Sequence, residues 1–344
     1  MTIKKIQACS LGLAALALTA MPMQSALAQS NVEIYGLVGV YAGSIKRSDM
    51  TPRVTQLGHG GLTTSYFGFR GREDLGGGLK AIFQIENFFQ PDTGAAGRNA
   101  TDPSFASRSA WVGIQGGFGQ LTLGRHTTPF YLAMQAVNPF VASTVFSPVV
   151  LQSYIAPFGG TIIGDTVWNN AIQYSIPTMN GFSATAIYGL GEVAGSNGVG
   201  NLGLTARYAQ GPFLATASAQ RVRVGATAPS TGQYAYLGGV SYDFSFAKLF
   251  GSVQKTERTV TDLESSTYQL GASIPVSQAG KVLASWSQTK ADVTPVRETT
   301  RNTAAIGYDY TLSKRTDLYA VYLRDKVTGN SAGNSYAVGI RHQF

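Results

Sequence analysis

The chain has 344 residues and a net charge of +8, and 44% of its residues are hydrophobic. Cys9 is the only cysteine, which excludes an internal disulfide framework and a metal site built from several cysteines. The basic residues are dispersed along the sequence rather than gathered, which argues against nucleic-acid binding.

The first residues have the pattern of an export signal. Lys4 and Lys5 precede an apolar run over 11–18, and Ala-Leu-Ala follows at 26–28. A membrane anchor is the alternative, but the apolar run falls short of the roughly 20 residues that span a bilayer. We expect residues 1–28 to be a signal peptide, and its loss lowers the net charge to about +6.

The remaining residues, 29–344, predict a single domain, because their residue composition and alternation are similar throughout. Apolar and polar side chains alternate in runs of about ten residues, the length of a tilted strand that crosses a membrane. In the segment 79–89, Ala81, Phe83 and Ile85 share one face, and Lys80, Gln84 and Glu86 share the other.

Turns and loops also alternate along the chain. Seven short turns, such as "EDLGGGLK" and "QGGFGQ", separate eight longer connections. The longer polar connections include those expected at 43–61, 90–104, 191–200, 224–233, 291–302 and 327–333. Together they join sixteen strands, and an even strand number with short turns at one end is typical of an outer-membrane barrel.

A soluble β-sandwich also alternates, but two features argue against it. One face of the strands is rich in Gly, Ser, Thr and Arg, which would make a poor dry core. Aromatic residues gather near strand ends, as in interfacial girdles: Tyr242, Phe244, Tyr308, Tyr310, Tyr319 and Tyr322. We predict an all-β, closed antiparallel transmembrane barrel, because closure satisfies every backbone group.

One connection is exceptionally long. No clean strand occurs from His126 to Thr166, and a stretch of this length is usually functional. It contains three Pro-Phe pairs, at 129–130, 139–140 and 157–158, and so much apolar surface would be costly in water. We predict that this loop folds into the barrel, the alternative being an outer loop that contacts the membrane or a partner.

The chain resembles the Gram-negative general porins, in particular the trimeric type of beta-proteobacteria. The resemblance covers nearly all of 29–344 and rests on "VEIYGLVGVY", "GFRGREDLGGGLKAIFQIEN", "SRSAWVGIQGGFGQLTLGRHTTP", "YTLSKRTDLYAVY" and "GIRHQF". It implies a sixteen-stranded homotrimer in the cell outer membrane, in contact with lipid and lipopolysaccharide. It also implies three separate pores, each narrowed by its third loop.

The resemblance and the alternation together indicate the pore-lining residues. They are Arg70, Arg72, Lys80, Arg108 and Arg207 on the wall, Arg125 at the root of the long loop, the acids Glu86 and Asp165, and Tyr66 and Gln173. Asp165 is the only acid between Asp102 and Glu192, so the loop opposes the wall cations with little negative charge. We predict a passive channel for small hydrophilic solutes with weak to moderate anion selectivity.

Two alternatives to this interpretation stay open. Each arginine could instead be a solvated or salt-bridged wall residue with no role in transport. The family often has arginine at position 66 and a basic residue at 173, where this chain has Tyr66 and Gln173. A lining that is more aromatic and less charged would favour hydrophobic or aromatic anions. The alternative to a passive diffusion channel is a substrate-specific outer-membrane channel with a shaped binding site at the constriction.

An enzyme is not predicted. His59, His126 and His342 are far apart in the strand map, and none has the spacing of a metal site or a catalytic pair. No cofactor motif is present, because the Gly-rich stretches are not followed by a helix.

The C-terminal segment "YAVGIRHQF" predicts the last strand, paired with the first. Within this strand, Ala337, Gly339 and Arg341 would face the lumen, and Phe344 would face outward. Terminal strands that end in Phe resemble the signal read by the outer-membrane assembly machinery. We therefore expect Phe344 to act as an assembly signal.

Overall fold

The computed structural model describes residues 31–48, 52–99, 102, 104–155, 160–194, 200–224, 231–294 and 297–344. The expected signal peptide, residues 1–28, lies outside this range. None of the helices in the described ranges has the length and apolar character needed to cross a membrane.

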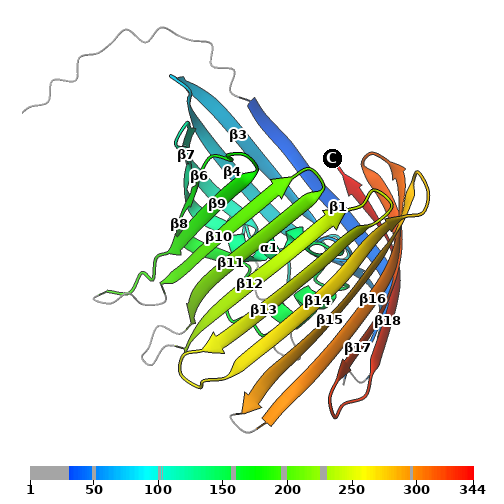
Figure 1. Cartoon of the computed structure of the whole chain (residues 1–344). Coiled ribbons are helices and arrows are strands. Elements are labelled where there is room, and N and C mark those ends of the chain that lie inside the picture. Colours follow the sequence, from blue (N-terminus) through cyan, green and yellow to red (C-terminus); the bar gives the residue numbers. More distant parts are fainter. Residues whose placement is uncertain are drawn as a thin grey trace, which may run out of the picture.

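The described chain is built almost entirely of antiparallel strands (Figure 1). The strands are β1 (Asn31–Ile45), β2 (Val54–His59), β3 (Tyr66–Gly76), β4 (Leu79–Gln90), β5 (Ala95–Ala96), β6 (Ser109–Gly116), β7 (Gly119–Thr127), β8 (Val167–Ser175), β9 (Phe182–Gly189), β10 (Asn201–Gln210), β11 (Phe213–Val224), β12 (Thr231–Asp243), β13 (Lys248–Arg258), β14 (Glu264–Pro275), β15 (Gly280–Thr294), β16 (Arg297–Ser313), β17 (Thr316–Val327) and β18 (Gly333–Gln343). Most of the connection expected at 291–302 is therefore strand, because β15 and β16 extend almost to each other.

These segments form sixteen wall strands in the described part of the chain. β3 pairs with Asn31–Leu37 of β1, and β2 pairs with the next stretch of the same strand, Val40–Ile45. β2 and β3 are therefore two halves of one wall strand, interrupted at 60–65, and β5 lies in the loop after β4. The predicted strand number is confirmed.

A serine side chain bridges the interruption. The hydroxyl of Ser65 accepts a hydrogen bond from the Gly39 amide at 3.0 Å and donates one to the Gly39 carbonyl at 3.1 Å. The hydroxyl thereby satisfies the Gly39 N–H and C=O groups, which a continuous strand would otherwise pair with its own backbone. The interrupted segment contacts the long third loop, since the Ser143 hydroxyl donates to the Gly61 carbonyl at 2.5 Å.

The first and last strands close the barrel, as predicted. β1 pairs with β18 from Leu37 with Gln343 to Ser44 with Tyr336. The backbone of Phe344 adds two more bonds, since it donates to Gly36 and accepts from Gly36, each at 3.1 Å. Closure leaves neither edge of the sheet unpaired.

Side chains alternate between lumen and exterior along each strand. In β17, Val321 and Leu323 face inward and are 5% and 0% exposed, while the outward Tyr322 is 43% exposed. Most of the predicted girdle aromatics are also exposed, but Tyr319 is not: it faces inward and is 3% exposed. Its odd position in β17 puts it on the same face as Val321, so the girdle assignment of Tyr319 was wrong.

Short turns and the chain terminus gather at one end, drawn uppermost in Figure 1. The turn between β3 and β4 has three consecutive residues with positive φ, Gly76, Gly77 and Gly78, a conformation that other residues rarely adopt. In outer-membrane barrels the short turns are periplasmic, so the opposite end faces the exterior.

The described residues of the long third loop, 128–155 and 160–166, lie inside the barrel, as predicted; we call them the constriction loop. It contains two helices, α1 (Pro129–Ala136) and α2 (Pro148–Tyr154). Thr128 and Ser147 cap them by accepting backbone hydrogen bonds, and a proline occupies the start of each. α1 packs on β9–β12 and α2 on β14–β16, so the loop covers one side of the inner wall.

Candidate pore and constriction

The apolar side chains of the constriction loop are buried against the wall. Phe130 and Phe140 are each 2% exposed, which explains why two of the Pro-Phe pairs occur in a loop. Phe140 and Phe146 pack with wall residues that include Leu283 and Leu323. The third pair, at 157–158, lies outside the described residues.

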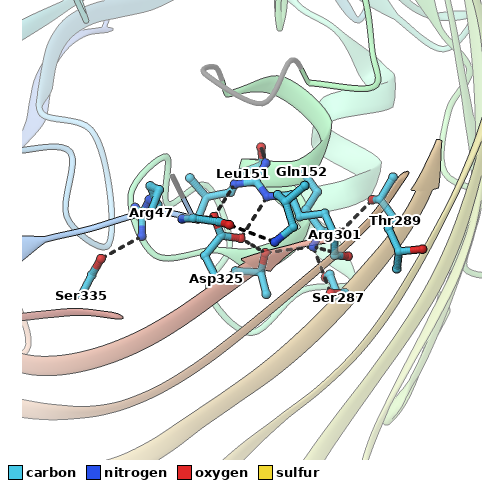
Figure 2. A network of polar contacts seen from close by, with 12 residues as sticks. Arg47, Leu151, Gln152, Ser287, Thr289, Arg301, Asp325 and Ser335 are labelled. Atoms are coloured by element: carbon cyan, nitrogen blue, oxygen red, sulfur yellow. Dashed lines mark hydrogen bonds and ion pairs between the residues drawn. The ribbon is translucent and has the colours of Figure 1, made fainter. Parts of the chain in front are cut away.

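A buried ion pair anchors α2 to the wall (Figure 2). Arg301 on β16 makes two bonds to Asp325 on β17, at 3.0 and 3.2 Å, and donates to the Leu151 carbonyl of α2 at 3.2 Å. Thr303 donates a further bond to Asp325 at 2.7 Å. The Arg301 and Asp325 side chains are 7% and 0% exposed, so this contact is shielded from water.

Gln152 extends the same network. Its amide donates to the Ser287 carbonyl at 3.0 Å and to the Thr303 hydroxyl at 2.9 Å, and it accepts from Thr289 at 2.8 Å (Figure 2). One loop residue therefore bonds to β15 and β16 at once, which fixes the height of α2 in the lumen.

Arg47 holds the segment of the loop that directly precedes α2. Its guanidinium donates to the Val145 carbonyl of the constriction loop and to the Ser335 hydroxyl, the latter at 3.3 Å. Burial lowers the pKa of Arg47 to about 10, which still leaves it cationic at neutral pH. The bonds of Arg47, Gln152 and Arg301 thus hold α2 and the segment before it to one part of the barrel wall, from β15 to β18.

The uncovered side of the lumen opens toward the exterior as a cavity of about 640 Å³, which we call the vestibule. Its wall side includes Tyr66, Phe88 and Arg108, and its loop side includes Tyr131 and Tyr154. The vestibule therefore lies between the constriction loop and the start of the chain, at the height where the channel is narrowed.

Arg108 is held rigidly at the edge of the vestibule. Its guanidinium lies over the Tyr66 ring at 4.0 Å and is paired with Glu86, whose side chain is 3% exposed. Tyr35 donates to the same carboxylate at 2.8 Å. Three predicted site residues, Tyr66, Glu86 and Arg108, are thus brought together, and the charge of Arg108 is matched by that of Glu86.

Arg70 is also paired. It makes two bonds to Glu33, at 2.8 and 3.0 Å, and its guanidinium lies over the Tyr35 ring at 4.6 Å. Both side chains are about half exposed. Arg70 faces the lumen below Arg108, because it continues the inward-facing series of Tyr66 and Gly68 on β3.

Three predicted cations lie nearer the periplasmic end, in a region that we call the lower lumen. Arg72 stands opposite Asn31, Lys80 opposite Gln115, and Arg207 opposite Thr216 in the strand registers. All three are on inward-facing positions, and Arg72 and Arg207 are exposed. None of them forms an ion pair with any residue in the described ranges.

Arg125 is placed differently from the other cations. It aligns with Ala110, an outward position of β6, and a register shift follows between Gly124 and His126. Its guanidinium donates to Asp102 at 2.9 Å and to the Ser107 carbonyl at 2.6 Å, and it also contacts Asn169. Arg125 is therefore bonded to the residue before Arg108, and it shares the Asp102 carboxylate with Arg98, which lies 3.9 Å from it.

The last two predicted residues lie apart from each other. Asp165, near the end of the constriction loop, is paired with Arg98 in the vestibule. Gln173 stands opposite Thr122 on an inward position of β8, and its Oε1 atom is buried with no hydrogen-bond partner. Neither residue contacts Arg108.

The site also contains residues that sequence reasoning did not single out. The rings of Tyr131 and Tyr154 pack edge to face at 5.3 Å on the loop side of the vestibule. The Thr128-Pro129 and Ser147-Pro148 pairs are helix-start signals that could have revealed both helices. The alternation of β17 could have placed Asp325 inward, but nothing local identified Arg301 as its partner.

Comparisons with known proteins agree with this architecture. Residues 12–330 match the Gram-negative porin family. Outer membrane porin protein 32 of Delftia acidovorans is 32% identical over 93% of this chain and 96% of its own. An outer membrane porin of Bordetella pertussis is 27% identical over the same shares.

Solved structures show the same barrel. The anion-selective porin from Comamonas acidovorans has a TM-score of 0.79 and 29% identity, over 92% of this chain and all of its own. OmpT of Vibrio cholerae, in its trimer form, has a TM-score of 0.68 at 14% identity and covers 92% of this chain. These relatives are channels, and the chain belongs to the Gram-negative porin family as an outer-membrane barrel for the passive diffusion of small solutes.

Proposed function

We propose that this porin is weakly to moderately anion-selective and that Arg72 and Arg207 contribute most of the selectivity. Both cations face the lower lumen and form no ion pair with a described residue, whereas Glu33 and Glu86 neutralise Arg70 and Arg108. The anion-selective porin of Comamonas acidovorans, similar in fold and sequence, supports the same direction.

Unpaired cations in a water-filled pore raise the local concentration of anions and repel cations. At physiological salt the Debye length is about 8 Å, so their field extends into the water of the lower lumen before it is screened. Lys80 adds to this field at the periplasmic rim, near Asp74 in the strand register.

Reversal potentials in a KCl gradient test the proposal. Wild-type protein in a planar bilayer should favour chloride, and the double variant R72Q/R207Q should move the reversal potential toward the cation direction. The matched control is R324Q, because Arg324 lies on an outward position of β17. A cation-selective wild type, or an unchanged double variant, would contradict the assignment.

We propose three further features of the working protein: removal of residues 1–28, a homotrimer with three pores, and contact with outer-membrane lipid and lipopolysaccharide. The trimer form of the Vibrio OmpT structure supports the second. Single-channel recordings should show conductance steps in groups of three, and N-terminal sequencing of the purified protein should begin at Gln29. Independent single steps or an intact leader would refute the corresponding feature.

We also propose that Phe344 is recognised by the outer-membrane assembly machinery. Its backbone completes the seam with Gly36, while its side chain is 43% exposed on the outer surface. Deleting Phe344 should lower the amount of assembled protein in cells far more than it lowers the stability of protein refolded in detergent. If assembly in cells and stability in detergent fall by the same amount, Phe344 serves only to close the barrel and is not an assembly signal.

A further inference from the structure

We propose that the vestibule is a weak binding site for small aromatic carboxylates of the benzoate class, with the ring stacked on the guanidinium of Arg108. The inference rests on the proposed anion-selective function and adds to it a substrate class and a site. Nothing in the family relationship assigns a ligand to these residues.

Arg108 presents a pre-oriented planar surface. One side of its guanidinium lies on Tyr66 at 4.0 Å, Phe88 is 5.8 Å away, and Glu86 fixes the edge. The side chain remains 29% exposed and lines the vestibule. A planar guanidinium stacks on aromatic faces, so a ligand ring can occupy the side that Tyr66 leaves open.

On the opposite side of the vestibule, the constriction loop contributes aromatic and apolar residues beside polar ones such as Asp165 and Thr166. Tyr131 and Tyr154 pack edge to face, and Val150 and Ile155 line the cavity beside them. Burial raises the pKa of Tyr131 to about 12, so its ring stays neutral. An uncharged aromatic wall facing a stacked arginine suits a flat ring rather than a hydrated ion.

The two arginines of the vestibule are each matched by a carboxylate. Arg108 is paired with Glu86 and Arg98 with Asp165, and a ring nitrogen of His59 lies 2.8 Å from Asp92. The ring of a solute, rather than its charge, is therefore what this region can recognise. The preference for a carboxylate comes from the proposed anion selectivity of the whole channel, because the unpaired cations of the lower lumen favour anionic over cationic solutes in transit.

The volume is consistent with a solute site inside an open channel. About 640 Å³ falls within the usual range for small-molecule pockets and leaves room for water beside a single ring. Binding is then compatible with flux, because a weakly held solute can leave toward the lower lumen.

The first test uses the wild-type protein alone, reconstituted in planar bilayers. Benzoate should reduce the chloride current in a saturable way, and its apparent affinity should exceed that of cyclohexanecarboxylate by roughly three- to tenfold, the range of one cation–π contact. Acetate should cause no saturable block. Equal block by benzoate and cyclohexanecarboxylate would overturn the proposal, whatever variants do.

The second test compares R108K with R324K. Lysine keeps the charge but not the planar surface, so R108K should weaken the block by benzoate toward that of cyclohexanecarboxylate, while R324K on the outer wall should not change it. Unchanged benzoate block in R108K would also overturn the proposal. Reversal potentials of the wild type in KCl, measured separately, report failure of the anion-selective function independently of failure of this site.

Discussion

Two arginine–carboxylate pairs on the inner wall have similar geometry but opposite surroundings. Arg301 and Asp325 approach to 3.0 Å beneath the constriction loop, with side chains 7% and 0% exposed. Arg70 and Glu33 approach to 2.8 Å on the open side, with side chains 54% and 53% exposed. Distance alone therefore does not reveal what an ion pair does in this barrel.

Burial decides the difference. Water screens the exposed pair, which contributes little to stability but remains part of the field that ions cross. Water cannot take the place of either partner in the buried pair. Arg301 also donates a hydrogen bond to the backbone carbonyl of Leu151 in α2. The covered side of the lumen thus holds the loop in place, whereas the exposed pair lies beside the water-filled path of the ions.

Of the variants considered, D325N should have the largest effect, because it removes one partner of the buried ion pair. It leaves the guanidinium of Arg301 buried without a counter-charge, which typically costs about 3–5 kcal/mol. We expect a lower free energy of unfolding, measured by urea titration with heat-modifiability on gels. Single-channel recordings should also show noisier currents and a larger mean conductance, because α2 loses an anchor.

The double variant R301L/D325L separates charge from packing. Replacing both partners with apolar residues removes the unpaired charge, so it should recover at least half of the stability lost in D325N. If the double variant is as unstable as D325N, the loss comes from the hydrogen bonds to the loop and not from the buried charge.

The variant E86Q addresses an intermediate case, since Glu86 is 3% exposed and its partner Arg108 is 29% exposed. Neutralising Glu86 uncovers the charge of Arg108 in the vestibule. The Coulomb energy between the Arg108 guanidinium and an ion about 8 Å away in water is roughly 0.5 kcal/mol. This energy corresponds to about a twofold rise in the chloride-to-potassium permeability ratio. The matched control, E257Q, lies on the outer wall and should leave the ratio unchanged.

The fold was largely predictable because its signals are local. Alternation over ten residues, as in β4 and β10, reports which face meets lipid, and Gly-rich turns mark the strand ends. The interruption between β2 and β3 was not predictable, because it depends on the Ser65 hydroxyl reaching Gly39 on a neighbouring strand. Tyr319 was misassigned because proximity to a strand end does not determine which face a residue occupies.

The candidate site was predictable only in part, for the same reason. The inward position of Arg70 followed from alternation and resemblance, and that of Arg108 from resemblance alone, but their partners did not. Glu33 precedes Arg70 by 37 residues, and Glu86 precedes Arg108 by 22. Such pairings depend on strand register, so the sequence could suggest where cations lie but not which of them are neutralised.

The variant E33Q should have the smallest effect, because it removes one partner of the exposed ion pair. Removing the exposed carboxylate uncovers Arg70 and should move the reversal potential toward chloride by less than E86Q does, because water screens this position more strongly. Stability in urea should not change measurably. The shift should also shrink between about 0.1 and 1 M KCl, as the Debye length falls from about 10 to 3 Å. A shift that persists undiminished at high salt would mean that Glu33 acts by positioning the Arg70 side chain, and the exposed pair would then be structural like the buried one.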